Sequence, residues 1–341
     1  MKKSIIMLLL FTTICAFGFA QGQEEGAAEE QTYVFKFAHS MSEQSVRHQS
    51  MELFKKELEE KTNGRIKVEI YANGVLGSES EVIDMVKTNN VQGARGSQFE
   101  KANPKYMIYN IPFVFNSADE FKYILHSDFE EAIAKDAQKN GYYIPATGIA
   151  GGFRQFTNNV RPINTPDDIK GLKMRVPPLE PVLKAMDALS ANPQQVPYKE
   201  TYMALKTGVV DGQENPFSNT YDMNFDEVQK YLSIGNYIIC PDCLFVSNTW
   251  YQALPDDLKT IFNEVSKEAM DWSTENWLAS EEPIAKELEQ NLITNVISDE
   301  NLQLFRAKMG PVYDYFINKG DFTQADLDDL NSRLEEYRAN H

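Results

Sequence analysis

The stretch IKVEIYANGVLGSESEVIDMVKTNNVQGA, residues 66–94, decides the fold class of this chain. Its first five residues alternate apolar and charged side chains, which is typical of a strand with one buried face. Ser78 and Glu81 then have the spacing of a helix capping box, and an apolar helical pattern follows them. A second short strand is expected near 91–94. Two strands joined by a helix predict parallel pairing, because the crossover helix returns the chain to the edge where the first strand began.

The same alternation of strands and helices extends in both directions from this stretch. Residues 33–37 are expected to form a strand, and the helix after them ends at Gly64. Further strands are predicted at 153–157, at 172–176 and from Val209. Helices are predicted to begin at three more positions: Thr165, about Glu200, and Thr323. The last third of the chain has a mostly helical pattern. We therefore expect two α/β lobes joined by strands that cross between them.

The composition limits the class of protein. The chain has 341 residues, of which 42% are hydrophobic and 24% charged, as in an ordinary globular protein large enough for two domains. Its formal net charge of −17 argues against binding to nucleic acid or to anionic membrane surfaces. It does not exclude an anionic ligand, because a buried pocket can carry its own local positive charge.

The N-terminal region is expected to lie outside the folded part. Residues 1–20 combine a basic start, an apolar run and small residues at a cleavage site, which is typical of a secretory signal peptide. The alternative is a single membrane anchor, for which the apolar run is short against the roughly 20 residues that a span needs. Residues 21–32 are polar and acidic and predict a flexible tail. We therefore expect a protein that is secreted to the periplasm.

Catalytic and metal-binding motifs are absent from the sequence. None of the four histidines has metal-ligand spacing with another, and no phosphate-binding or nucleophile motif occurs. Cys240 and Cys243 are expected to form a small-loop disulfide or to remain as free thiols, and a redox or zinc site is disfavoured. We expect no metal, no cofactor and no enzymatic activity.

Three polar residues are candidates for holding an anionic ligand. Arg175 lies on the face of the 172–176 strand opposite its apolar residues, near the carboxyl end, where open α/β sheets bind ligands. A guanidinium there can hold a carboxylate by two parallel hydrogen bonds. Arg154 follows two glycines, which permit close approach of backbone or ligand. Asn215 precedes a proline, which restricts its backbone to extended conformations. Each also has an ordinary alternative, as a surface or ion-paired arginine or a turn residue.

A series of motifs, taken in order, resembles the solute-binding proteins of tripartite ATP-independent periplasmic (TRAP) transporters, the DctP family. The motifs are KTNGR (61–65), GVLGS (74–78), IPFVF (111–115), GFRQ (152–155), RPI (161–163), TPDD (165–168), GLKMRVP (171–177), YMAL (202–205) and GVVDGQENP (208–216). The resemblance implies a two-lobed, periplasmic-binding-protein-like α/β fold with mixed sheets, hinge strands and a long helix bridging both lobes. It implies that lobe 1 consists of 33–151 and 242–280, and lobe 2 of 152–241 and 281–341.

The resemblance also implies roles for the three candidates. The family's signature arginine, which pairs with the ligand carboxylate, corresponds to Arg175, an assisting arginine to Arg154, and a ligand-facing asparagine to Asn215. The lobes are expected to close on the ligand and release it to the membrane subunits of a TRAP transporter, with the chain acting as a monomer. The rival hypotheses are a binding protein that serves a sensor kinase and a periplasmic enzyme acting on an organic acid.

The ligand itself is expected to depend on residues where the sequence departs from its relatives. The segment 93–100 is unusual, and Arg95 or Glu100 is expected to face the cleft. An arginine there suits a second carboxylate or several hydroxyls, whereas a glutamate suits hydroxyls only. Further candidate residues of the cleft wall come from other segments: His39, Gln155, Phe217 and Asp242. We expect a sugar acid such as a hexuronate, with a dicarboxylate as the next alternative.

Overall fold

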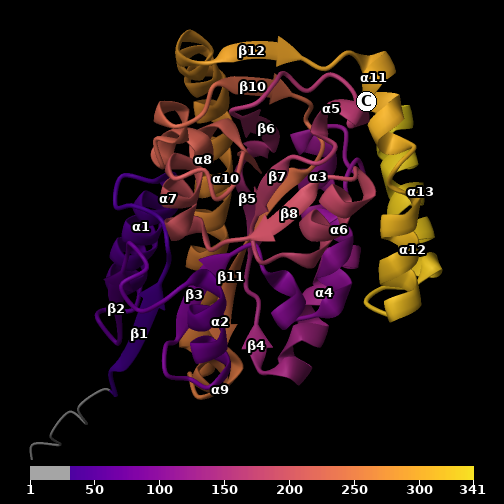
Figure 1. The fold of residues 1–341 in the computed structure, drawn as a ribbon. Helices are drawn as coiled ribbons and strands as arrows, with labels where there is room; N and C mark the ends of the chain where they lie inside the picture. Colours follow the sequence, from indigo (N-terminus) through magenta and orange to yellow (C-terminus); the bar gives the residue numbers. More distant parts are fainter. Residues whose placement is uncertain (1–30) are drawn as a thin grey trace, which may run out of the picture. The chain divides into compact units, whose positions relative to one another are not determined.

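Two sheets form the frame of the protein in the computed structural model, which describes residues 31–341 (Figure 1). The first sheet has the order β2 (Ile66–Tyr71), β1 (Tyr33–Ala38), β3 (Gly93–Gly96), β11 (Ile239–Ser247) and β4 (Tyr142–Tyr143), and β5 (Thr147–Phe153) also pairs with β11. The second sheet has the order β12 (Ile293–Val296), β10 (Tyr231–Ile234), β6 (Gln155–Asn158), β9 (Gly212–Asn215), β7 (Lys173–Val176) and β8 (Asn192–Gln195). The predicted signal peptide, and the predicted tail up to residue 30, lie outside the described residues.

Strand pairing confirms the expected fold class. β1 pairs in parallel with both β2 and β3, as the pattern of residues 66–94 predicts. In the second sheet β7 is parallel to β8 and β9, whereas β6 is antiparallel to β9 and β10. Both sheets are therefore mixed, and a parallel group in each places the carboxyl ends of several strands at one edge, where ligands bind in this class of fold.

Helices alternate with the strands along the chain. Before β11 the helices are α1 (Val46–Lys61), α2 (Glu79–Lys87), α3 (Ala118–Leu125), α4 (Asp128–Asp136), α5 (Pro166–Ile169), α6 (Glu180–Ala188), α7 (Thr201–Lys206) and α8 (Phe217–Asp222). After it they are α9 (Asn248–Gln252), α10 (Asp256–Asn291), α11 (Asp299–Arg306), α12 (Gly310–Lys319) and α13 (Gln324–Asn340). The predicted helix starts at Ser78, Thr165 and Thr323 are confirmed, and each has a capping box.

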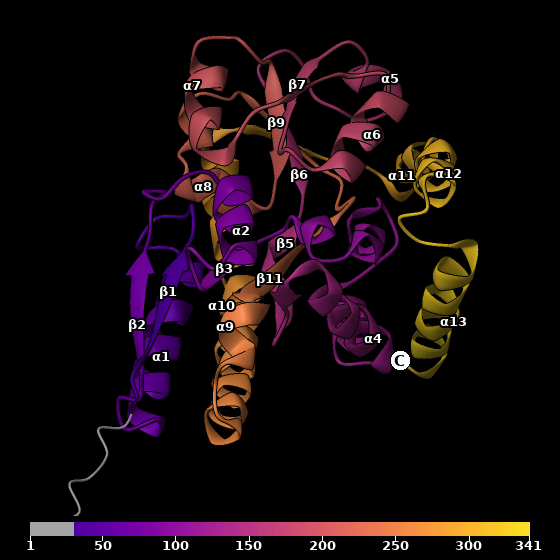
Figure 2. The same ribbon diagram turned by 90° about the horizontal axis from the view of Figure 1, so that it is seen from below.

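The chain crosses from one sheet to the other beside the long helix. Only Arg154 separates β5, in the first sheet, from β6, in the second, and its backbone N–H donates to the carbonyl of Ile238 just before β11. The 36-residue α10 packs against α1 and β5 and also against α8 and β12. Figures 1 and 2 show α10 extending alongside both sheets. The hinge strands and the bridging helix implied by the resemblance are therefore present.

The structure differs from the sequence predictions at two places. The strand expected from Val209 begins at Gly212, because Val209 lies in an exposed bend. The last third contains β10, β11 and β12 besides its helices.

Helix α13, at the end of the chain, packs against α3, and its Arg338 pairs with Glu120. Contacts between helices so far apart in sequence leave no local signal. The division of the chain into lobes stays a prediction.

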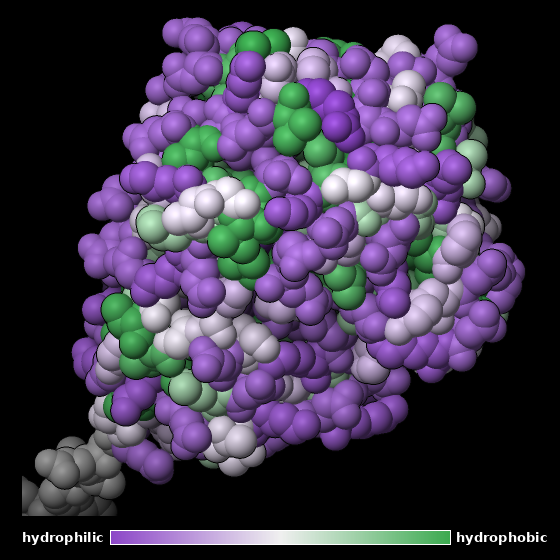
Figure 3. Space-filling view, in the orientation of Figure 1, coloured by the Kyte–Doolittle hydropathy of each residue, from purple (hydrophilic) through white to green (hydrophobic). Residues whose placement is uncertain are grey.

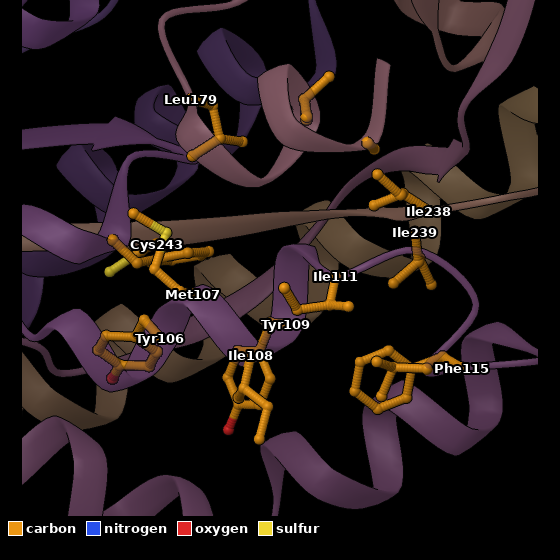
Figure 4. Close-up of a cluster of buried hydrophobic side chains, with 14 of the residues drawn as sticks. Tyr106, Met107, Ile108, Tyr109, Ile111, Phe115, Leu179, Ile238, Ile239 and Cys243 are labelled. Atoms are coloured by element: carbon orange, nitrogen blue, oxygen red, sulfur yellow. The ribbon is translucent and has the colours of Figure 1, made fainter. Parts of the chain in front are cut away.

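The core joins residues from distant parts of the chain. In Figure 4 Ile111 lies near Ile238 and Ile239, which lead into and begin β11, and Tyr106 and Met107 of the 3₁₀ segment Pro104–Asn110 lie near Cys243. All of these apolar side chains are buried, so the hinge region rests on close apolar packing. The face seen in Figure 3 is mostly hydrophilic, with apolar side chains in small groups. Among residues 31–341, none of the helices has the length and apolar character that a membrane span requires.

Candidate functional site

A cavity of about 300 Å³ lies between side chains from the two sheets. Arg154, Arg175 and Asn215 line it from the second sheet and its approach, and Arg47 and Glu79 line it from α1 and α2 of the first. Its volume is at the lower end of the range for small-molecule pockets, roughly 300–1,000 Å³. In residues 31–341, no group of three or more His, Cys, Asp or Glu side chains is placed to hold a metal ion. The volume, together with the arginines in the lining, suits a small molecule that carries a polar or anionic group.

Arg175 lies at the carboxyl end of β7 and is 1% exposed. Its Nε donates to the carbonyl of Val196 at 2.8 Å, which fixes the plane of the guanidinium. No carboxylate of the described residues lies at ion-pairing distance from it, and its terminal amino groups have no hydrogen-bond partner among them. Burial lowers the pKa of Arg175 to about 10, so the group stays charged at neutral pH. Such a guanidinium can donate hydrogen bonds to the carboxylate of a ligand.

Arg154 is paired within the protein. Its Nε and one terminal nitrogen donate to the carboxylate of Glu214, the second at 2.7 Å, and Tyr237 donates its hydroxyl to the same carboxylate. The pairing with Glu214 raises the pKa of Arg154 despite its burial. The nitrogen bound to Glu214 also lies 3.3 Å from Oδ1 of Asn215, whose Nδ2 donates to Gln213 at 2.6 Å. Asn215 and Arg154 are therefore held as one unit at the edge of the cavity.

The glycines before Arg154 have the role expected from the sequence, close approach of backbone. Gly151 has a φ of +91°, and a Cβ there would lie 2.7 Å from Cβ of Pro216. Both the left-handed conformation and the lack of space require glycine. This contact places the segment that carries Arg154 directly against the segment that carries Asn215.

The opposite wall contains a buried network of ion pairs. Asp242 on β11 is fully buried and accepts hydrogen bonds from Arg47, at 3.0 Å from one terminal nitrogen, and from Arg95. Glu79 lies 3.9 Å from Arg47 and accepts a hydrogen bond from the backbone N–H of Ser97 at 2.9 Å. Burial raises the pKa of Glu79, while Arg47 and the backbone N–H groups favour its ionised form. Two arginines and two carboxylates balance each other in this wall.

Three of the nine candidate residues line the cavity: Arg175, Arg154 and Asn215. Arg95 and Asp242 lie behind the wall, where Arg95 also donates to Ser273 at 2.9 Å. Glu100 lies on a 3₁₀ turn, and its Oε2 is buried without a hydrogen-bond partner. None of the three is among the residues that line the cavity, because the fold directs each of them into the packed interior of the first sheet's side.

The other three candidates also lie outside the cavity lining. Nε2 of His39 lies 3.1 Å from Nδ1 of His48, and burial lowers the pKa of His39 to about 2. The amide of Gln155 bonds the backbone of Phe153 and of the loop at 235–236, so it stabilises the hinge. Phe217 packs near Leu288 and Leu292.

Several residues of the cavity were not expected from the sequence. The main ones are Arg47, Glu79, Gln98, Tyr198, Asn219 and Cys240. Glu79 directly follows the cap Ser78, so the helix start was predictable but the direction of its side chain was not. Tyr198 and Asn219 lie just after β8 and just after β9, the edge at which Arg175 also lies. Their position after the ends of neighbouring strands was the one feature of the sequence that could have identified Tyr198 and Asn219 as cavity residues.

Cys240 and Cys243 are free thiols, so of the two alternatives left open by the sequence, a disulfide or free thiols, the structure has the second. Cys240 lines the cavity, and its Sγ lies 3.5 Å from a terminal nitrogen of Arg154. Cys243 lies in the core cluster with Tyr106. Burial raises the pKa of Cys240 to about 11, so the thiol is neutral and weakly reactive.

Comparison with known proteins agrees with this geometry. Residues 37–319 match the family model described as "Bacterial extracellular solute-binding protein, family 7". A curated solute-binding protein of Chromohalobacter salexigens is 30% identical over 280 residues, which cover 79% of this chain and 80% of the relative.

Solved structures give the same result. A TRAP periplasmic solute-binding protein from Roseobacter denitrificans with bound β-D-glucuronate is 26% identical, with a TM-score of 0.82, 88% of this chain and 98% of that chain covered. One from Sulfurospirillum deleyianum with bound succinate is 26% identical, with a TM-score of 0.80 and coverage of 89% and 99%. The chain therefore belongs to family 7 of the bacterial extracellular solute-binding proteins, the DctP family of TRAP solute-binding proteins for small acids.

Proposed function

We propose that the protein captures a small organic acid by pairing its carboxylate with Arg175 and delivers it to the membrane subunits of a TRAP transporter. The observation that carries the proposal is the guanidinium of Arg175, which is buried, charged, and without an ion-pair partner among the described residues, yet lines the cavity. A carboxylate is the group that a planar guanidinium binds best, because two N–H groups match its two oxygens.

A sugar acid such as a hexuronate is the favoured ligand, and a dicarboxylate the next. Similar TRAP proteins hold β-D-glucuronate, in Roseobacter denitrificans, and succinate, in Sulfurospirillum deleyianum. The lining of this cavity includes polar side chains besides its arginines, among them Ser97, Gln98 and Asn219. Hydroxyls of a sugar acid can form hydrogen bonds with such groups, whereas the methylenes of a simple dicarboxylate cannot. On the basis of the predicted signal peptide we expect these events to occur in the periplasm, and we expect the protein to act as a monomer.

Calorimetric titration tests the role of Arg175. The chain from residue 21 onward is titrated with glucuronate, galacturonate, galactonate and succinate. We expect Arg175→Ala to weaken binding of the preferred acid by roughly 100-fold or more, since a buried charge pair loses one partner. Arg175→Lys keeps the charge but loses the fork, and we expect it to weaken binding by about 10-fold.

A matched control is Arg161→Lys, because Arg161 donates to the backbone carbonyls of Asp168 and Lys170 and does not line the cavity. Its affinity should equal that of the wild type. Unchanged affinity in both Arg175 variants would remove the proposed binding mode. Delivery is tested separately, by uptake of the same acid into vesicles that contain the cognate membrane subunits. Uptake that does not need this protein would contradict delivery.

A further inference from the structure

The buried charged groups beside the cavity can be counted one by one, apart from the exposed Glu81, Lys199 and Glu200, which also line it. On the first wall, Arg47 and Arg95 face Asp242 and Glu79, so two cations balance two anions. On the second wall, Arg154 balances Glu214. Arg175 has no such partner among the described residues. The buried groups at the cavity therefore carry one uncompensated positive charge, which a single carboxylate would neutralise.

The count matters because the groups are buried. An extra charge that enters a buried site without a partner costs several kcal/mol, since the surrounding medium screens it poorly. A ligand with one carboxylate satisfies Arg175 and leaves the other pairs intact. A second carboxylate at the far end of the ligand, where it lies against the first wall, meets Arg47 already engaged with Asp242 at 3.0 Å.

Glu79 is the carboxylate of that wall that lines the cavity. Its side chain is 20% exposed and lines the cavity, whereas Asp242 behind it is fully buried. One oxygen accepts a hydrogen bond from Ser97, and the other lies near Arg47. A carboxylate has lone pairs for more than these two contacts, and it can accept from a hydroxyl but repels another carboxylate.

We propose that Glu79 is a specificity residue that limits the ligand to one carboxylate, held by Arg175, and accepts hydrogen bonds from hydroxyls at the ligand's other end. The proposal rests on the proposed function of the cavity and narrows its ligand to hydroxylated monocarboxylates. The carboxylate of Glu79 repels a second carboxylate of a ligand, because both groups are negatively charged. The same oxygen atoms accept hydrogen bonds from hydroxyls of a ligand.

A matched pair of ligands tests the proposal. Galactonate and galactarate have the same carbon chain and the same four inner hydroxyls, but the far end is a hydroxymethyl group in the first and a carboxylate in the second. Calorimetric titration at neutral pH should show wild-type protein binding galactonate more tightly than galactarate, by at least about 10-fold. In Glu79→Gln the amide keeps an oxygen for Ser97 but has no charge. The ratio of the two affinities should fall by at least about 10-fold, through weaker galactonate and stronger galactarate binding.

The control variant is Glu69→Gln, which changes the net charge equally on an exposed strand position that does not line the cavity. It should leave the ratio unchanged. Equal wild-type affinities for the two ligands, or an unchanged ratio in a folded Glu79→Gln protein, would overturn the role of Glu79. The wild-type ratio decides the question even where the variant does not fold. Failure of the proposed function looks different, since all acids would then bind independently of Arg175.

Discussion

The two walls of the cavity contain the same number of buried arginines and use them differently. Arg47 and Arg95, on the side of the first sheet, share the carboxylate of Asp242. Arg154, on the side of the second sheet, is paired with Glu214, and Arg175 has no carboxylate partner among the described residues. A wall whose buried arginines are all ion-paired therefore lies across the cavity from Arg175, which has no carboxylate partner among the described residues.

This difference distinguishes the paired arginines, which hold segments of the fold together, from Arg175, which we propose as the ligand-binding group. A buried ion pair that is complete within the protein holds segments together, because breaking it leaves a charge without compensation. A buried cation without a partner destabilises the empty protein, and a ligand that supplies the missing anion stabilises the folded state by mass action. Variants of the two walls should therefore change different quantities, stability on one side and affinity on the other.

Asp242→Asn should have the largest effect on stability. Its side chain accepts from Arg47, Arg95 and the backbone N–H of Cys243. Within residues 31–341 the amide therefore leaves Arg95 without an ion pair and Arg47 with Glu79, at 3.9 Å, as its remaining carboxylate. We expect the free energy of unfolding to fall by about 3–5 kcal/mol, measured by chemical denaturation of the protein without ligand.

The control for that measurement is Asp257→Asn, since Asp257 pairs with Arg65 on the surface and its side chain is 56% exposed. Exposed pairs contribute at most about 1 kcal/mol. Similar losses in the two variants would show that the buried network has no special structural role.

Glu100 lies on the side of the first sheet, outside the cavity lining, and has no ion-pair partner among the described residues. The pH dependence of stability tests the effect of its burial. Burial raises the pKa of Glu100 from 4.5 to about 7. A carboxyl group with a raised pKa binds its proton more tightly in the folded state, so stability is lost as pH rises from about 4.5 to 7. The loss is about 3 kcal/mol in full. Glu100→Gln removes this loss.

The measurement is the difference in unfolding free energy between Glu100→Gln and wild type at several pH values. The difference should grow in favour of the variant across that pH window and stay constant above it. A constant difference from pH 4 to 8 would mean that Glu100 titrates normally in the folded protein.

The fold was predictable from sequence to the extent that its signals are local. Alternation in residues 66–70 and the caps at Ser78, Thr165 and Thr323 depend on neighbours within a few positions, and all of them are confirmed. The position of α13 was not predictable in this way, because it depends on contacts such as Arg338 with Glu120, 218 positions apart.

The site shows the same limit. Arg175 could be predicted from the sequence because its place near the end of a strand follows from the alternation of its immediate neighbours. The position of Arg95 outside the cavity lining was not predictable in this way, since its contacts are with Asp242 and Ser273, 147 and 178 positions later. Arg47, which the sequence did not single out, lines the cavity.

Glu281 on α10 offers a smaller effect that belongs to the second wall. It accepts hydrogen bonds from the backbone N–H groups of Ser218, at 3.0 Å, and Phe217, at 3.3 Å, directly after the segment of Asn215. Gly152 lies so close that a Cβ there would be 2.9 Å from Oε2 of Glu281. One carboxylate of the bridging helix therefore contacts both segments that carry Arg154 and Asn215.

We expect Glu281→Gln to weaken binding of the preferred acid by about 10-fold, because an amide N–H replaces one acceptor and the two segments shift relative to each other. Calorimetric titration measures the affinity, and thermal melting confirms that the variant is folded. Glu287→Gln is the matched control, since Glu287 also joins α10 to α8, but through the hydroxyl of Tyr221 on the exposed side. If Glu281→Gln and Glu287→Gln had the same affinity for the acid, the position of Glu281 beside the cavity would have no effect of its own on binding.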